Sequence, residues 1–228
     1  MQRIYDCSVD TDLLTGMRLA KVSLGRKELV VFPTDTVYGL ACDAFSHEGV
    51  QKLLEAKGRD RQSPPPVLIG STSALAGLAH EIPNLALKLA ETYWPGALTI
   101  ILKAQPSLTW DLGETKGTVA LRMPDHKIAL ALLKETGPLA VSSANLTGQE
   151  AAITCQQAEA YLGSKVSVYL DGGSSPKAEA STIVDLTDLV DSVNESGEIV
   201  TTGKARVVRR GALSVEKLAI VLGENLEV

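Results

Sequence analysis

Leu29-Val30-Val31-Phe32-Pro33-Thr34-Asp35-Thr36-Val37-Tyr38-Gly39-Leu40 is the stretch of sequence that decides the fold. Its apolar, partly β-branched start predicts a buried strand that stops at Pro33. After the proline the chain opens into short polar side chains, an arrangement that can hold a small polar substrate with hydroxyls and freed amides. Thr and Asp are also good helix caps, so a local capping role is the competing interpretation.

Helices and strands alternate along the rest of the chain. The residue pattern predicts helices over 10–24, 47–57, 72–80, 84–93, 125–136, 154–162 and 214–222, and strands over 67–69, 98–102, 118–121, 139–141, 166–170, 182–186 and 206–209. Ser46 and Asp125 are expected to cap two of the helices, and Gly58 and Gly137 to end them. The pattern indicates an α/β (α+β) fold with a twisted, mixed β-sheet flanked by helices. The polar segment 189–203 is expected to be a loop or hairpin excursion, not a domain boundary.

Composition indicates an ordinary globular protein. The chain has 228 residues, 45% hydrophobic and 21% charged, with a formal net charge of −5. This length fits one domain over residues 1–228, which we expect, with two small domains as the alternative. The acidic charge argues against nucleic-acid binding as the main function, because phosphate backbones require a basic surface. No apolar run approaches the ~20 residues of a membrane span and no signal peptide is recognised, so no membrane association and a cytoplasmic location are expected.

The usual nucleotide and metal signatures are missing. Segment 197–205, GEIVTTGKA, has one residue too many between its glycines for a Walker A motif, and Ala205 stands where Ser or Thr belongs. No metal site is predicted, because no CxxC pair or metal spacing is found. The residues concerned are three cysteines, expected to be buried, and three scattered histidines: Cys7, Cys42, Cys155, His47, His80 and His126.

A cation-rich loop follows the predicted helix 47–57. Lys57, Arg59 and Arg61 fall within five residues, and the prolines after Ser63 stiffen the loop. Fixed cations suit a triphosphate, and arginine adds bidentate geometry. Cations at a helix end also offset the helix dipole, which accounts for Lys57 but not for the two arginines. Truncating Lys57 or Arg59 is expected to cost little packing at such a position.

Two further strand ends carry polar groups. Arg122 follows the apolar strand 118–121 and precedes Pro124, where it can pair with a substrate carboxylate or form a structural salt bridge. Segment 142–148, SSANLTG, follows the strand 139–141, where an ordinary turn is the alternative. A serine nucleophile is not predicted, because no base is suggested nearby.

Six segments, in order, resemble the YrdC-type family of threonylcarbamoyl-AMP synthases. They are PTDTVYGL (33–40), KGR (57–59), WPGALT (94–99), VALRMP (119–124), SSANLTG (142–148) and STIVD (181–185). The resemblance runs from about Thr11 to Gly211, which we take as the core of the domain. It implies a YrdC-like fold with a concave active-site surface, in the short form without the separate C-terminal domain of longer members.

The resemblance also implies the site residues. The family's Lys-x-Arg and Ser-x-Asn signatures fall on Lys57 and Arg59, implied to be catalytic, and on Ser143 and Asn145. The implied threonine pocket consists of Thr34, Arg122, Ser142 and Ser181. The implied ATP contacts are Lys57, Arg59, Ser63, Thr118, Ser143, Asn145 and Arg209.

The sequence departs from the family's pattern at three places. Leu68 stands where many members have a histidine that contacts threonine, so this contact is missing or replaced. Segment 177–180 contains no glycine, although members often have one shortly before the STIVD serine. The late Arg-Pro-Gly of the family is Arg209-Arg210-Gly211 here.

The resemblance implies an enzyme, a nucleotidyltransferase that joins L-threonine, bicarbonate and ATP into threonylcarbamoyl-AMP and pyrophosphate, with Mg²⁺. Its product is expected to pass to a tRNA-modifying transferase complex, and weak RNA binding is a further expectation. Two alternatives remain. One is an RNA-binding or ribosome-maturation module of the same fold, which the acidic charge disfavours. The other is a carbamoyl-transfer domain like that of hydrogenase-maturation proteins, whose zinc-finger cysteines this chain lacks.

Overall fold

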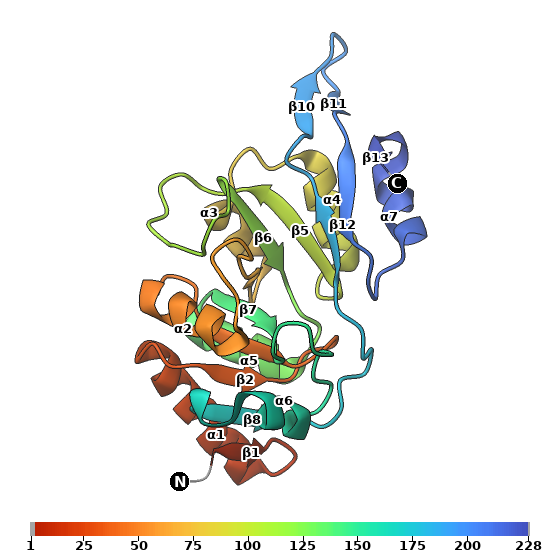
Figure 1. Cartoon of the computed structure of the whole chain (residues 1–228). Helices are drawn as coiled ribbons and strands as arrows, with labels where there is room; N and C mark the ends of the chain where they lie inside the picture. The colour runs from red at the N-terminus through yellow and green to blue at the C-terminus, as the bar shows by residue number, and fades with distance from the viewer. Residues whose placement is uncertain (1–2, 228) are drawn as a thin grey trace.

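The computed structural model describes residues 3–227, and within them eleven strands form one mixed sheet (Figure 1). Their order is β1-β8-β2-β3-β7-β4-β6-β5-β9-β12-β13, and β10 and β11 form a separate pair. This confirms the predicted mixed sheet flanked by helices. The strands are β1 (Ile4–Asp6), β2 (Val30–Phe32), β3 (Gly39–Asp43), β4 (Val67–Leu68), β5 (Leu98–Lys103), β6 (Thr118–Arg122), β7 (Leu139–Ser143), β8 (Val168–Asp171), β9 (Thr182–Asp185), β10 (Val190–Val193), β11 (Ile199–Thr202), β12 (Ala205–Arg209) and β13 (Leu226–Glu227).

The helices lie close to their predicted positions. Helix 72–80 was expected to be continuous, but it consists of a 3₁₀ turn (Thr72–Ala74) followed by the short α3. The α-helices are α1 (Asp10–Gly25), α2 (His47–Lys57), α3 (Leu75–Leu78), α4 (Asn84–Tyr93), α5 (Lys127–Thr136), α6 (Cys155–Leu162) and α7 (Val215–Leu222). None of the helices within residues 3–227 combines the length and apolar character that a bilayer crossing needs.

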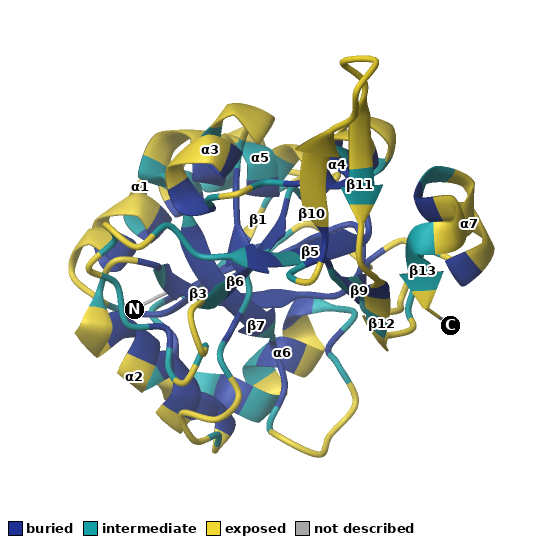
Figure 2. Cartoon of the chain, turned by 90° about the horizontal axis from the view of Figure 1, so that it is seen from above, coloured by how far each residue is buried: buried dark blue, intermediate teal, exposed yellow. Residues whose placement is uncertain are grey.

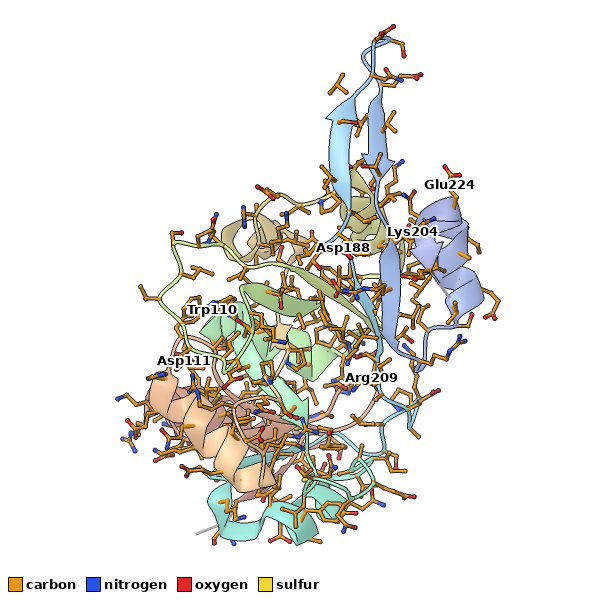
Figure 3. All side chains as sticks on the ribbon, turned by 45° about the horizontal axis from the view of Figure 1, so that its top comes forward. Trp110, Asp111, Asp188, Lys204, Arg209 and Glu224 are labelled. Atoms are coloured by element: carbon orange, nitrogen blue, oxygen red, sulfur yellow. The ribbon has the colours of Figure 1, made fainter. Side chains whose placement is uncertain are left out.

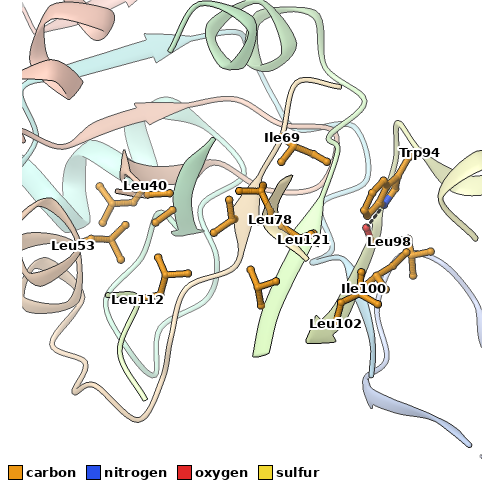
Figure 4. Close-up of a cluster of buried hydrophobic side chains, with 14 of the residues drawn as sticks. Leu40, Leu53, Ile69, Leu78, Trp94, Leu98, Ile100, Leu102, Leu112 and Leu121 are labelled. Carbon is orange, nitrogen blue, oxygen red and sulfur yellow. Dashed lines mark hydrogen bonds between the residues drawn. The ribbon is translucent and has the colours of Figure 1, made fainter. Parts of the chain in front are cut away.

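Helices cover both faces of the central strands, so these strands are buried on both sides (Figure 2). Successive residues of a strand point to opposite faces. Accordingly Val30 and Phe32 of β2 pack in one cluster with residues of α1 and α5, whereas Val31 packs in the other with residues of α2, α4 and α6. Figure 4 shows part of the second cluster, in which the indole nitrogen of Trp94 donates to the backbone oxygen of Leu98 at 2.7 Å.

Local capping chemistry sets the boundaries of α2 as predicted. The Ser46 hydroxyl accepts a hydrogen bond from the Gly49 amide, and Gly58 ends the helix in the left-handed conformation with φ of 65°. The prediction that Asp125 caps α5 is wrong, because the helix begins at Lys127 and its N-cap is His126. Asp125 instead donates its backbone N–H to the Asp35 carboxylate at 3.0 Å.

Three other expectations need correction or completion. Strand β3 was not predicted, although its first four residues are buried between β2 and β7. The excursion at 189–203 is a hairpin of β10 and β11 that projects from the body of the molecule (Figure 1).

Cys42 and Cys155 are buried as expected, but Cys7 is only half-buried. A single domain over 1–228 stays a prediction, and residues 1, 2 and 228 lie outside the described part.

Candidate active site

A cavity of about 230 Å³ opens at the polar end of the central strands. Seven of the predicted site residues line it: Thr34, Arg59, Arg122, Ser142, Ser143, Ser181 and Arg209. Its remaining lining is mostly apolar or hydroxyl-bearing: Thr36, Val37, Tyr38, Gly39, Pro64, Pro66, Leu68, Thr99, Val141, Ala151, Ala180 and Ile183. The structure therefore brings together segments that are widely separated in the sequence.

Strand register explains why these segments meet. Gly39 of β3 pairs with Ser143 of β7, so the loop 33–38 between β2 and β3 lies beside the end of β7. Strand β4 links β7 to β6 and places Leu68 opposite Arg122. The sheet thus delivers a hydroxyl-rich loop, a serine pair and a guanidinium to one edge.

Arg122 is 7% exposed and is held by three acceptors. Its Nε donates to the Gly96 oxygen at 2.9 Å, one Nη to the Thr36 hydroxyl at 2.9 Å, and the other Nη to Asp35 at 2.5 Å. These bonds occupy three of the five N–H groups of a guanidinium. Within residues 3–227 no acceptor takes the remaining N–H on either terminal nitrogen, so both are free for a ligand in the cavity.

Asp35 is the anion that orients Arg122. One carboxylate oxygen accepts from Arg122 and from the Asp125 amide, and the other accepts from Lys177 at 2.9 Å. Burial alone would raise the pKa of Asp35, but the charges of Arg122 and Lys177 outweigh it and hold this pKa below its ordinary value. In the sequence, Asp35 was named only within its motif, and its place next to Thr34, a predicted pocket residue, was the signal for it.

Lys57 lies behind the cavity wall and not at the surface. It is 1% exposed, and its Nζ donates to the backbone oxygens of Ser143 and Asn145 and to the Asn145 side-chain oxygen. Burial, and then the charge of Arg59, lower its pKa to about 7. The expectation that truncating Lys57 costs little packing is therefore wrong, because the side chain turns inward at the helix end and satisfies three acceptors.

Arg59 and Arg209 reach the cavity from two different sides. Arg59 donates to the Ser142 hydroxyl at 3.2 Å, and Arg209 of β12 donates to the Ser181 backbone oxygen at 2.8 and 3.0 Å. Figure 3 labels Arg209. Burial lowers the pKa of Arg209, and the nearby charge of Arg59 lowers it further. The two guanidiniums repel each other across the cavity, which indicates a site with an excess of positive charge.

Four predicted site residues do not line the cavity: Lys57, Ser63, Thr118 and Asn145. Ser63 is exposed on the loop 58–66, and Thr118 stands at the opposite end of β6 from Arg122, where its hydroxyl donates to the Thr115 oxygen. Asn145 is buried beside Lys57, behind the serine pair. Thr99 was missed as a site residue, although it ends the WPGALT segment; its hydroxyl lies 2.8 Å from that of Ser181.

Comparisons with known proteins show the family to which this chain is similar. The Sua5/YciO/YrdC family model, described as telomere recombination, matches residues 23–208. The chain is 45% identical over 223 residues to a Mycobacterium leprae protein provisionally named a threonylcarbamoyl-AMP synthase, covering 98% of this chain and 95% of the relative. It is 36% identical over 200 residues to the threonylcarbamoyl-AMP synthase of Bacillus subtilis, covering 87% of this chain and 57% of the relative.

A solved structure extends the likeness to three dimensions. The crystal structure of P. abyssi Sua5 complexed with L-threonine matches with a TM-score of 0.83 and 30% identity, over 99% of this chain and 63% of that chain. The chain thus spans most of its mycobacterial relative, but less than two thirds of the B. subtilis and P. abyssi proteins. The resemblance drawn from six short segments is confirmed, and the chain belongs to the Sua5/YciO/YrdC family, whose similar members include threonylcarbamoyl-AMP synthases.

Proposed function

We propose that this chain makes threonylcarbamoyl-AMP from L-threonine, bicarbonate and ATP. The observation that carries the proposal is one cavity that joins a buried guanidinium with free N–H groups, serine hydroxyls from two strand ends, and two further arginines. The full-length match to a relative with this provisional name, and the L-threonine bound to P. abyssi Sua5, support the same substrate class.

L-threonine occupies the inner part of the cavity in this proposal. The two free N–H groups of Arg122 can take both oxygens of a carboxylate, the geometry in which arginine binds carboxylates most strongly. The Ser142 and Ser181 hydroxyls accept from Arg59 and Arg209, so the oxygen of each is oriented and its own proton can be directed to the ligand. Thr34, only 2% exposed, completes the wall, and its hydroxyl donates to the Val37 oxygen at 2.6 Å.

ATP lies outside the inner pocket, along the loop 58–66. A cavity of about 230 Å³ is smaller than the ~300–1,000 Å³ of typical ligand pockets, so it suits an amino acid without a nucleotide. Thr118 stands four positions from Arg122, or roughly 13 Å at the rise of a strand. An extended triphosphate bridges such a distance, with Arg59, Ser63 and Arg209 beside its phosphates and Thr118 at its far end. Lys57 acts through Ser143 and Asn145, whose positions it fixes.

The reaction requires no nucleophile from the protein. The threonine amine adds to CO₂ derived from bicarbonate and gives a carbamate. A carbamate oxygen then attacks the α-phosphorus of ATP, the bond to the bridging oxygen breaks, and pyrophosphate leaves. The arginines hold the two anions together and neutralise the charge that develops on the phosphate, so catalysis comes from positioning and electrostatic stabilisation.

Mg²⁺ enters this proposal as part of the substrate. Among the described residues no Asp or Glu lines the cavity, and the nearby Asp35 is occupied by Arg122 and Lys177. Mg²⁺ prefers carboxylate, phosphate and water oxygens. The cavity does not fit a magnesium ion held by the chain, so the ion arrives bound to the phosphates of ATP.

The product is proposed to serve the threonylcarbamoyl modification of tRNA, through a partner transferase in the cytosol. Pyrophosphate release tests the proposed activity. With the purified chain, release from ATP is expected only when L-threonine and bicarbonate are both present. Equal release with either one omitted would rule the proposal out, and salt-sensitive RNA binding without turnover would favour the RNA-binding alternative.

A further inference from the structure

The loop 58–66, which carries Arg59, has few attachments of its own. Residues 60–63 are exposed, and two bonds within the loop link Asp60 to Gln62 and Ser63. Among the described residues, every hydrogen bond or ion pair that ties residues 60–65 to another segment goes to Asp111 or Glu114. The hydrogen bonds and ion pairs that hold residues 60–65 in place therefore come from one neighbouring segment.

That segment is part of the loop 105–117, between β5 and β6. Arg61 donates to both carboxylate oxygens of Asp111, at 2.6 and 2.8 Å, and His47 at the start of α2 bonds to the same carboxylate. The Glu114 amide donates to the Arg61 backbone oxygen at 2.7 Å. At Gly113 a Cβ atom would lie 2.6 Å from that oxygen, so only glycine permits the two backbones to approach this closely.

The loop 105–117 is itself firmly held. Leu112 is 2% exposed and packs in the hydrophobic core, directly beside Asp111. Trp110 stacks on Phe45, which precedes α2, with ring centroids 5.6 Å apart and an interplanar angle of 23°. Figure 3 shows Trp110 and Asp111 together above α2. Asp111 is thus an ion-pair partner fixed between two anchored residues.

We propose that Asp111 is a positioning residue that fixes the loop 58–66 and thereby holds Arg59 at the cavity for the phosphates of ATP. The role for ATP rests on the proposed function, whereas the fixing of the loop does not. Asp111 lines no part of the cavity, so it acts through Arg61 and touches no substrate. One terminal nitrogen of Arg61, His47 and the Gly113 amide all bond to the Asp111 carboxylate. An ion pair within such a network contributes measurably, unlike most exposed pairs.

Asp111→Ala tests both parts. Hydrogen–deuterium exchange of the ligand-free protein should rise in residues 59–63, and calorimetric titration should show ATP binding weakened about fivefold with threonine binding within about twofold of wild type. Arg61→Asp should raise amide exchange and weaken ATP binding in the same way as Asp111→Ala. The double variant Arg61→Asp with Asp111→Arg, which reverses the pair, should recover most of the ATP affinity. Asp111→Asn, which keeps the shape, serves if the alanine variant folds poorly.

Glu81→Ala is the matched control, because it breaks another exposed ion pair, with Lys103 at 2.6 Å, that involves no residue of the loop 58–66. It should change neither the exchange of residues 59–63 nor the affinity for ATP. Unchanged exchange in Asp111→Ala would overturn the proposal, and so would equal losses for ATP and threonine that follow a lower melting temperature. If wild type binds no ATP, the proposed function fails, while the exchange data still decide whether Asp111 fixes the loop.

Discussion

The ammonium group of Lys57 lies 2.7 Å from the backbone oxygen of Asn145, a residue 88 positions further along the chain. Lys57 also bonds to Ser143, so it joins the end of α2 to the end of β7. The Lys-x-Arg and Ser-x-Asn signatures are therefore two halves of one structural unit. In this unit the lysine supports the wall of the site, and Arg59 alone of the first signature faces the cavity.

Lys57→Met should destabilise the fold. Methionine keeps the length of the buried side chain but leaves three oxygens without their donor, at an expected cost of about 2–3 kcal/mol in the free energy of unfolding. The measurement is denaturant unfolding, with Lys52→Met as control, because Lys52 lies on the same helix in an exposed ion pair with Glu48. Equal free energies of unfolding for the two variants would contradict the prediction that the buried Lys57 stabilises the fold.

Arg59→Ala should leave the fold intact and remove activity. Among the described residues, the Arg59 side chain bonds only to the Ser142 hydroxyl. Truncation therefore removes one positive charge from the site with little loss of packing. Loss of such charge stabilisation should slow turnover about a hundredfold. The assay is pyrophosphate release at saturating substrates, compared with Arg18→Ala on the exposed face of α1. Near-normal turnover in Arg59→Ala would contradict the assignment.

Arg122→Lys should weaken threonine binding more than ATP binding. Lysine offers a single ammonium and cannot hold Thr36 and Asp35 while presenting two parallel N–H groups to a carboxylate. We expect the dissociation constant for threonine to rise at least about tenfold. Each ligand is titrated separately, and Asp35→Asn serves as the comparison, because it removes the partner but keeps the guanidinium. A greater loss for ATP than for threonine would show that Arg122 serves the nucleotide.

Acid should destabilise the protein through Asp35. The folded-state pKa of Asp35 is held below its ordinary value, so the unfolded chain takes up this proton first as the pH falls. The stability that Asp35 contributes is thus complete above pH ~4 and is lost as the pH falls through the folded-state pKa. In Asp35→Asn the free energy of unfolding should therefore fall less steeply below pH ~4. Parallel pH profiles for the two proteins would contradict the ion-pair role.

Local chemistry was enough to predict some elements and not others. Helix α2 was predicted residue for residue, because Ser46 and Gly58 encode its ends within a few positions. Strand β3 was missed because its short sequence, GLACD, has weak strand propensity, and its neighbours β2 and β7 impose the strand. The predicted cap at Asp125 was wrong because α5 begins at Lys127, and the Asp125 amide bonds instead to Asp35, 90 positions away.

In the candidate site, too, some features follow from local sequence and others depend on distant residues. The residue types at the strand ends predicted a polar cavity, and seven of the named residues line it. The direction of each long side chain was not predictable from the sequence. Lys57 turns inward because it bonds to acceptors on Ser143 and Asn145, which are 86 and 88 residues away in the sequence. Arg61 bonds to Asp111, which is 50 residues away in the sequence, and does not line the cavity. Such long-range partners leave no trace in local spacing.

Product analysis with labelled bicarbonate tests the central claim most directly. The chain is incubated with ATP, L-threonine and ¹³C-bicarbonate, and the nucleotide products are identified by mass spectrometry. We predict a new species that contains AMP, threonine and a single ¹³C atom, formed together with pyrophosphate. Formation of AMP or ADP without any species that carries both threonine and the label would contradict the account.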